Sequence, residues 1–116
     1  MSLRDAILSK DDFQSRLVDV PEWGVKIMLR EMSGPGRNTF FEIVNFDKDN
    51  KAPLVEMYAA AIALSARDPE TGDLIFTPED KQALMEKSAT VIERLGKAAL
   101  VLSGLAPNSR DDAEKN

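Results

Sequence analysis

The 116-residue sequence contains no cysteine and no histidine. Without cysteine, the chain can form neither a disulfide bond nor a thiolate metal site, which fits a reducing compartment. Without histidine, it lacks the commonest general base and the commonest metal ligand of proteins. We therefore predict no catalytic residues, no metal site and no cofactor.

Long apolar runs and basic clusters are also missing. The longest unbroken apolar run, Met57–Leu64, is far shorter than the roughly 20 residues that cross a bilayer. The N-terminus has no basic start and no long apolar segment, so no secretory signal is predicted. Twenty acidic against 15 basic residues give a net charge of −5, which argues against nucleic acid or an anionic membrane as the main partner. These features predict a soluble, cytoplasmic protein.

The motifs of common enzyme classes are absent. The sequence has no GK[ST] phosphate loop, no glycine-rich dinucleotide turn after a strand, and no nucleophile with a histidine. Acidic pairs such as Asp11-Asp12 and Asp111-Asp112 fall in predicted loops, where nothing would separate their pKa values. A small enzyme or ligand-binding domain is therefore the last of the functions considered.

What the sequence does contain is typical of one globular domain. It is 43% apolar and 30% charged, and its length can enclose a real core. We predict an α+β fold, a mainly helical single domain over residues 1–106 with an N-terminal β-hairpin and a short additional strand. Residues 107–116 are predicted to be a disordered polar tail, because alanine is their only apolar residue type.

Alternation of apolar and polar residues predicts the hairpin over Ser15–Glu31, with Pro21–Gly24 as its turn. Trp23 has two interpretations, a cap on the open end of the sheet, which we favour, or a ligand-binding side chain. The short strand is expected at Leu74–Phe76, where the straightened end of the preceding helix could pair with it.

Capping residues and helical periodicity predict helices over residues 2–9, from Ser33 to about Phe46, over 53–66 and over 77–104. In the second of these, Phe40, Phe41 and Val44 are expected to face inward. The last stretch could be one helix, or two helices with Ser88 as the second cap, and both alternatives stay open.

Two helical stretches are apolar on almost every side, one around residues 54–64 and the other around 98–105. Either the two helices bury each other, or one of them supplies a protein–protein interface or a self-assembly surface. For the second case the candidate interface residues are Leu54, Met57, Tyr58, Ile62, Leu100, Val101 and Leu105.

Several short motifs, taken in order, resemble one protein family. They are V-P-E-W-G at Val20–Gly24, R-E-M-S-G at Arg30–Gly34, a helix with Arg37, Phe40 and Phe41, D-P-E-T-G-D-L-I-F-T-P-E-D at Asp68–Asp80, and L-x-x-A-A-L-x-L-S-G-L at Leu95–Leu105. This order and spacing, which spans nearly the whole chain, is similar to the tail assembly chaperones of long-tailed (siphovirus) bacteriophages.

The resemblance implies a non-catalytic chaperone that binds the phage tape-measure protein and keeps it soluble while tail-tube subunits assemble around it. It also implies a homo-oligomer in the host cytoplasm that is absent from the mature virion, with the tail-tube protein as a possible second partner. The alternative is a structural tail or head–tail joining protein that stays in the virion. Such chaperones often have a longer form made by ribosomal frameshifting, and Glu114-Lys115-Asn116 is compatible with a slippery run of adenines.

Overall fold

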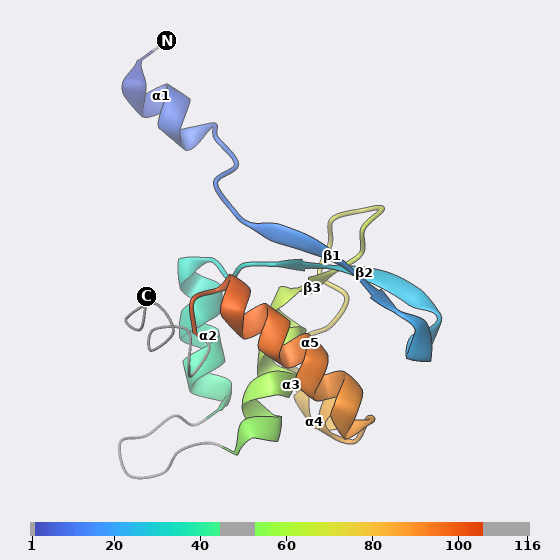
Figure 1. The fold of residues 1–116 in the computed structure, drawn as a ribbon. Helices are drawn as coiled ribbons and strands as arrows, with labels where there is room; N and C mark the ends of the chain where they lie inside the picture. Colours follow the sequence, from blue (N-terminus) through green and yellow to red (C-terminus); the bar gives the residue numbers. More distant parts are fainter. Residues whose placement is uncertain (1, 45–52, 106–116) are drawn as a thin grey trace, which may run out of the picture.

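The computed structural model describes residues 2–44 and 53–105. Within these ranges the chain forms five α-helices and a three-stranded antiparallel sheet (Figure 1). The predicted α+β class, mainly helical with an N-terminal hairpin, is confirmed. The predicted tail at 107–116 and the end of the predicted 33–46 helix lie outside the described residues.

The hairpin consists of β1 (Ser15–Val20) and β2 (Val25–Arg30), as predicted. Pro21–Trp23 make one turn of 3₁₀ helix, and Gly24 follows with a φ of 69°. This left-handed conformation is accessible to glycine at little cost, so the residue can reverse the chain here. The strand order is β1-β2-β3, which places β1 at an edge of the sheet.

The third strand differs from the prediction. β3 is Ala66–Arg67, the straightened end of a helix, and it pairs with β2. The predicted strand at Leu74–Phe76 is reduced to an isolated bridge between Leu74 and Arg67, with a hydrogen bond from the Ile75 N–H to the Ala66 carbonyl at 3.0 Å. The expected pairing with the straightened end of the helix is therefore present, but it is shorter than predicted. Because β3 has only two residues, it offers too few backbone hydrogen-bonding groups to hold a longer strand along its second edge.

The helices are α1 (Leu3–Leu8), α2 (Gly34–Ile43), α3 (Leu54–Ser65), α4 (Lys81–Met85) and α5 (Ala89–Leu102). Ser33 caps α2, since its Oγ accepts a hydrogen bond from the Gly36 N–H at 3.1 Å. The 77–104 stretch divides at Ser88, so the two-helix alternative is correct, although the Ser88 side chain makes no capping hydrogen bond. A 3₁₀ turn at Pro78–Asp80 leads into α4.

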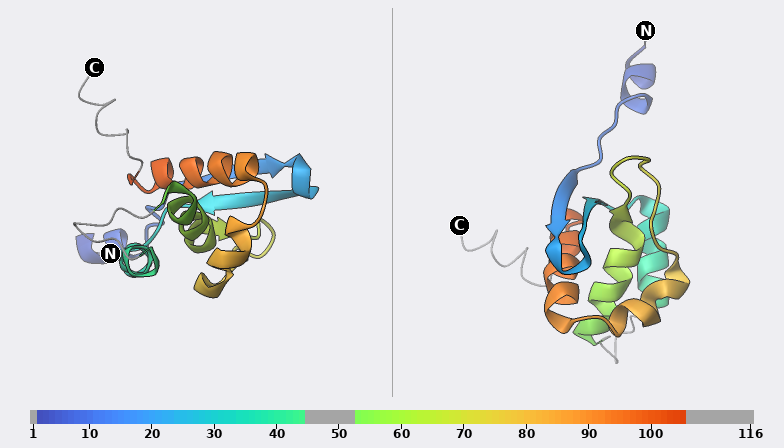
Figure 2. Two further views of the ribbon diagram at one scale, coloured as in Figure 1. Left: turned by 90° about the horizontal axis from the view of Figure 1, so that it is seen from below. Right: turned by 90° about the vertical axis from the view of Figure 1, so that its right-hand side faces the viewer.

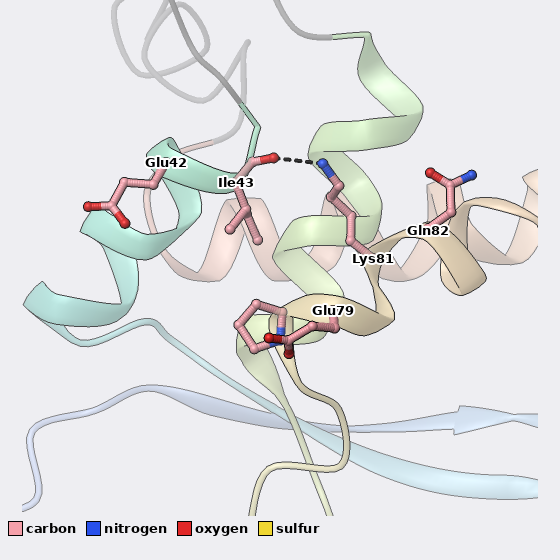
Figure 3. Close-up of a pocket in the computed structure, with 6 residues that line it drawn as sticks. Glu42, Ile43, Glu79, Lys81 and Gln82 are labelled. Atoms are coloured by element: carbon pink, nitrogen blue, oxygen red, sulfur yellow. Dashed lines mark hydrogen bonds between the residues drawn. The ribbon is translucent and has the colours of Figure 1, made fainter.

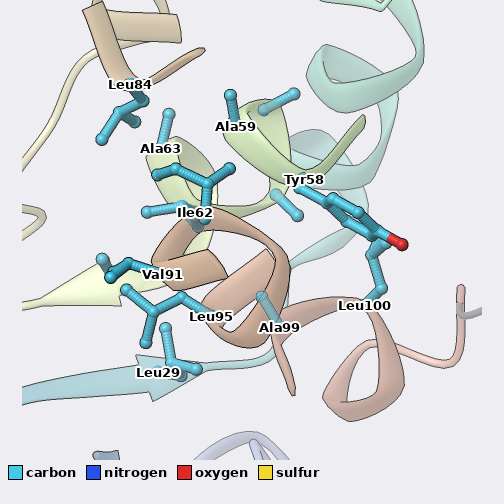
Figure 4. Packing of buried hydrophobic residues seen from close by; sticks show 14 of the residues in the cluster. Leu29, Tyr58, Ala59, Ile62, Ala63, Leu84, Val91, Leu95, Ala99 and Leu100 are labelled. Carbon is cyan, nitrogen blue, oxygen red and sulfur yellow. The ribbon is translucent and has the colours of Figure 1, made fainter. Parts of the chain in front are cut away.

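α3 lies at the centre of the domain and contacts α2, α4, α5 and β2. Its closest packing is against α5, where the core between the two helices is built largely from small and branched side chains (Figure 4). A Cβ atom added at Gly96 of α5 would lie 2.6 Å from the Cα of Tyr58 on α3. Glycine at this position therefore permits the close approach of the two helix backbones.

On α2, Phe40 and Val44 are buried as predicted, but Phe41 is 39% exposed. Successive residues of a helix point about 100° apart, and on α2 the Phe40 side chain faces the core while Phe41 lies toward the surface. The Phe41 ring lies edge-on to Phe40, with 5.5 Å between the ring centroids.

Candidate protein interaction surfaces

Three of the seven predicted interface residues belong to the core. Tyr58 is 7% exposed, and Ile62 and Leu100 are fully buried between α3 and α5 (Figure 4). Their assignment to an interface is corrected, because a partner cannot reach them in this fold. The two apolar helices, α3 and α5, bury most of their apolar residues in the shared core. This burial explains why these helices are apolar on nearly every side.

The other four predicted residues remain at least partly accessible. Leu54, the first residue of α3, is 55% exposed, and Val101, near the end of α5, is 60% exposed. Met57 and Leu105 are half-buried and pack against the core. A partner that contacts apolar residues of α3 or α5 can therefore reach the ends of these helices but not their middle.

Three motifs that carried the family resemblance meet at the end of α5. The Met32 N–H donates to Ser103 Oγ at 2.9 Å, and Arg37 Nη2 donates to the Ser103 carbonyl at 2.6 Å. Ser103 is 5% exposed. These bonds join the start of α2 to the end of α5, so Arg37 and Ser103 hold the fold together.

An open hollow of about 440 Å³ lies between α2 and the start of α4 (Figure 3). In it, Lys81 Nζ donates to the Ile43 carbonyl at 2.6 Å and to Glu56 Oε1 at 2.7 Å. These contacts engage the ammonium group and link α4 to α2 and α3. Lys81 therefore has a structural role here, since its ammonium group joins three helices.

The hairpin turn is tied to α5 by an ion pair. Arg94 donates two hydrogen bonds to the Glu22 carboxylate, at 2.7 and 2.8 Å. Hydrogen bonding from Arg94, followed by a backbone hydrogen bond, lowers the pKa of Glu22 to about 2. The adjacent Trp23 is half-buried and packs against the core, which agrees with its interpretation as a cap.

A second apolar surface beside the hairpin was not predicted. Two adjoining hollows of about 480 and 250 Å³ share Val25, Lys26, Asp68 and Pro69. We call this surface the hairpin groove; its apolar lining is Leu17, Trp23, Val25, Ile27, Pro69, Ile75 and Phe76. The sequence signal that could have revealed it is Leu17, an apolar residue on the exposed face of the alternating strand β1.

The described part of the chain holds no cluster of three acidic side chains suited to a metal ion. None of its helices has the length and hydropathy needed to cross a bilayer. Large apolar side chains are exposed on this surface, among them Leu54 and Val101.

Comparison with known proteins agrees with this picture. No curated protein sequence matches the chain. The solved structure of the bacteriophage HK97 tail assembly chaperone matches at a TM-score of 0.61 and 29% identity, covering 87% of this chain and 98% of that one. The sequence profile of a family described as phage tail assembly chaperone matches residues 2–116. The chain thus belongs to the phage tail assembly chaperone family.

Proposed function

We propose that this protein binds the tape-measure protein of its phage and keeps it soluble while tail-tube subunits assemble around it, without catalysing a reaction. The observation that carries the proposal is membership of the family across residues 2–116. In this proposal the protein acts in the host cytoplasm and is absent from the mature virion. Self-association and a contact with the tail-tube protein are further parts of it.

Exposed apolar side chains on a domain with a complete core support this proposal. Leu54 and Val101 are more than half exposed, and Val55 beside Leu54 is 37% exposed. Such side chains can cover apolar segments of a client that would otherwise aggregate. The net charge of −5 would keep the resulting complex soluble by repulsion between complexes.

Co-expression tests the proposal directly. The tape-measure protein is expressed alone and together with this chain, and its soluble fraction is measured. We expect it to be insoluble alone and soluble with the chaperone. Equal solubility in both cases would reject the proposal.

A pair of variants on α5 locates the contact. Val101→Glu places a charge at a position that is 60% exposed, and we expect it to lower the soluble fraction. Thr90→Glu is the matched control, because it adds the same charge at an exposed position in the first turn of the same helix. Equal losses for both variants would show that charge, and not the Val101 contact, was responsible.

The alternative function is a structural tail or head–tail joining protein. Purified virions distinguish the two, since a chaperone is absent from them and a structural protein is present in fixed copy number. Mass spectrometry of virions with the major tail protein as internal standard makes this comparison.

A further inference from the structure

Helix α2 is held at both of its ends by polar contacts. At its start, the Met32 N–H and Arg37 Nη2 donate to Ser103 at 2.9 and 2.6 Å. At its end, the Ile43 carbonyl accepts a hydrogen bond from Lys81 Nζ at 2.6 Å (Figure 3). Ser103 is 5% exposed, whereas the Lys81 side chain is 21% exposed. Water therefore reaches the contact at the end of α2 more readily than the contact at its start.

Few apolar side chains hold α2 against the rest of the domain. Of the ten residues of α2 only Phe40 is buried, whereas α5 buries six of its 14 residues. Val44, directly after the helix, is also buried, and Ile43 is half-buried against the core. Figures 1 and 2 show α2 at the edge of the domain, and α3 is its main neighbour among the described elements. An element with few buried apolar side chains can open locally while the rest of the domain stays folded.

The start of α2 is the end that stays in place during such an opening. Residues 31–33 are its whole connection to β2, so the start of the helix cannot move far from the sheet. The hydrogen bond from Arg37 to the buried Ser103 fixes the same end. A movement that leaves the start in place must displace the other end, at Ile43 and Val44.

The Lys81 ammonium group closes this movable end. Besides the Ile43 carbonyl, it contacts Glu56 Oε1 at 2.7 Å, and the Glu56 side chain is 18% exposed. Glu56 lies in the first turn of α3, so one cation joins the end of α2 to both α3 and α4. Hydrogen bonds from a charged donor are stronger than neutral ones, and loss of the donor would leave a partly buried carboxylate without its cation.

We propose that Lys81 acts as a latch that holds α2 closed on α3, and that the Ile43 end of α2 opens without unfolding the rest of the domain. Opening would uncover Val44 at the end of α2 that meets the first turn of α3, where Leu54 is 55% exposed. The apolar surface at this end of α3 would thus become larger. Use of that surface by the client rests on the proposed function, whereas the opening of α2 does not.

Thiol labelling measures the opening on a chain that contains no cysteine. Val44→Cys reports on the end of α2, and Val91→Cys is the matched reporter on α5, because both valines are 1% exposed. With excess thiol reagent, we expect Val44→Cys to react at least about tenfold faster than Val91→Cys, since local opening is more frequent than global unfolding. Equal rates at the two positions would overturn the proposal.

Removal of the Lys81 ammonium group tests the latch itself. Lys81→Met keeps an unbranched side chain that donates no hydrogen bond. It should raise the labelling rate of Val44→Cys at least about tenfold and leave that of Val91→Cys within about twofold. Lys97→Met is the control, because it removes an exposed ion pair with Glu93 on α5, and it should leave both rates unchanged. Equal increases at both positions, or no increase at Val44→Cys, would count against the latch.

Hydrogen exchange gives a second measurement that needs no cysteine. In Lys81→Met, the backbone amides of residues 38–44 should exchange at least about tenfold faster than in the wild type, while those of α5 keep their protection. Glu56→Gln should give a smaller increase, because glutamine retains an acceptor for Lys81 without the charge. Uniform acceleration along the chain would show a global loss of stability and reject the latch.

The co-expression assay separates this proposal from the proposed function. Local labelling of Val44→Cys with no effect of the chain on tape-measure solubility would reject the function and leave the latch standing. A chain that keeps the tape-measure protein soluble but labels equally at Val44→Cys and Val91→Cys would do the reverse.

Discussion

At the scale of single residues, Gly96 determines how closely α3 and α5 can approach. Gly96→Ala would place a methyl group against the backbone of Tyr58, so the helices must separate. We expect a loss of about 1–3 kcal/mol in the free energy of unfolding, measured by urea denaturation.

Thr90→Ala, at an exposed position of the same helix, is the control for this substitution. It should be neutral or slightly stabilising, because alanine has a higher helix propensity than threonine. If Gly96→Ala were as stable as this control, the close contact with Tyr58 would not limit the packing.

The Glu22–Arg94 pair predicts a dependence of stability on pH. Since the pKa of folded Glu22 is about 2, below its ordinary value of 4.5, the carboxylate stabilises the fold at pH values above about 4.5. This contribution is lost as the pH falls from 4.5 toward 2. Carboxyl chemical shifts across this range measure the pKa, and Arg94→Met should return it toward the ordinary value. An unchanged pKa in Arg94→Met would contradict the role of the pair.

Leu100 and Val101 are adjacent on α5, but substitution by glutamate should lower stability strongly at the first position and little at the second. Leu100 is fully buried and Val101 is 60% exposed. Leu100→Glu puts an unpaired charge in the core and should cost about 3–5 kcal/mol, a large part of the stability of an ordinary domain, so its thermal midpoint should fall sharply. Val101→Glu should keep the wild-type thermal midpoint. Circular dichroism melts compare the two, and similar midpoints would mean that this part of α5 is less well packed than the structure indicates.

At the scale of elements, local signals predicted the hairpin and the helix caps. Pro21 and Gly24 specify the turn, and Ser33 specifies the start of α2, through interactions within a few residues. The third strand was misplaced because its pairing depends on how α3 ends against β2. That is a contact between distant parts of the chain, and periodicity does not report it.

The prediction of interface residues was limited in the same way, because contacts between distant parts of the chain cannot be read from composition. Composition revealed that α3 and α5 are apolar on nearly every side, but not which sides face each other. Tyr58 and Leu100 became core residues because Gly96 lets the two helices approach closely, and a lone glycine in a helix gives no sign of its partner. The exposure of α1 was equally hidden, since its apolar spacing is that of any amphipathic helix.

The end of α5 supplies a prediction about how elements are joined. Ser103→Ala removes the acceptor of the Met32 N–H, which is then left partly buried without that hydrogen bond. We expect a loss of about 1–3 kcal/mol in unfolding free energy. Ser9→Ala is the control, because its hydroxyl makes only an exposed hydrogen bond to Ala6. Equal stability of the two variants would show that the Ser103 contact is not needed to hold α2 on α5.

At the scale of the whole molecule, the domain divides its apolar residues between two purposes. The middle of α3 and α5 forms the core, whereas α1, the hairpin groove and the helix ends leave apolar side chains exposed. A monomer with no partner would gain little from this exposure. The division fits a protein that binds both its own copies and a client.

If copies contact each other while bound to the tape-measure protein, binding should be cooperative. A bound copy would raise the effective concentration of the next copy beside it. We expect the wild type to bind a labelled tape-measure fragment with a sigmoidal curve. A hyperbolic curve at every protein concentration would separate self-association from client binding.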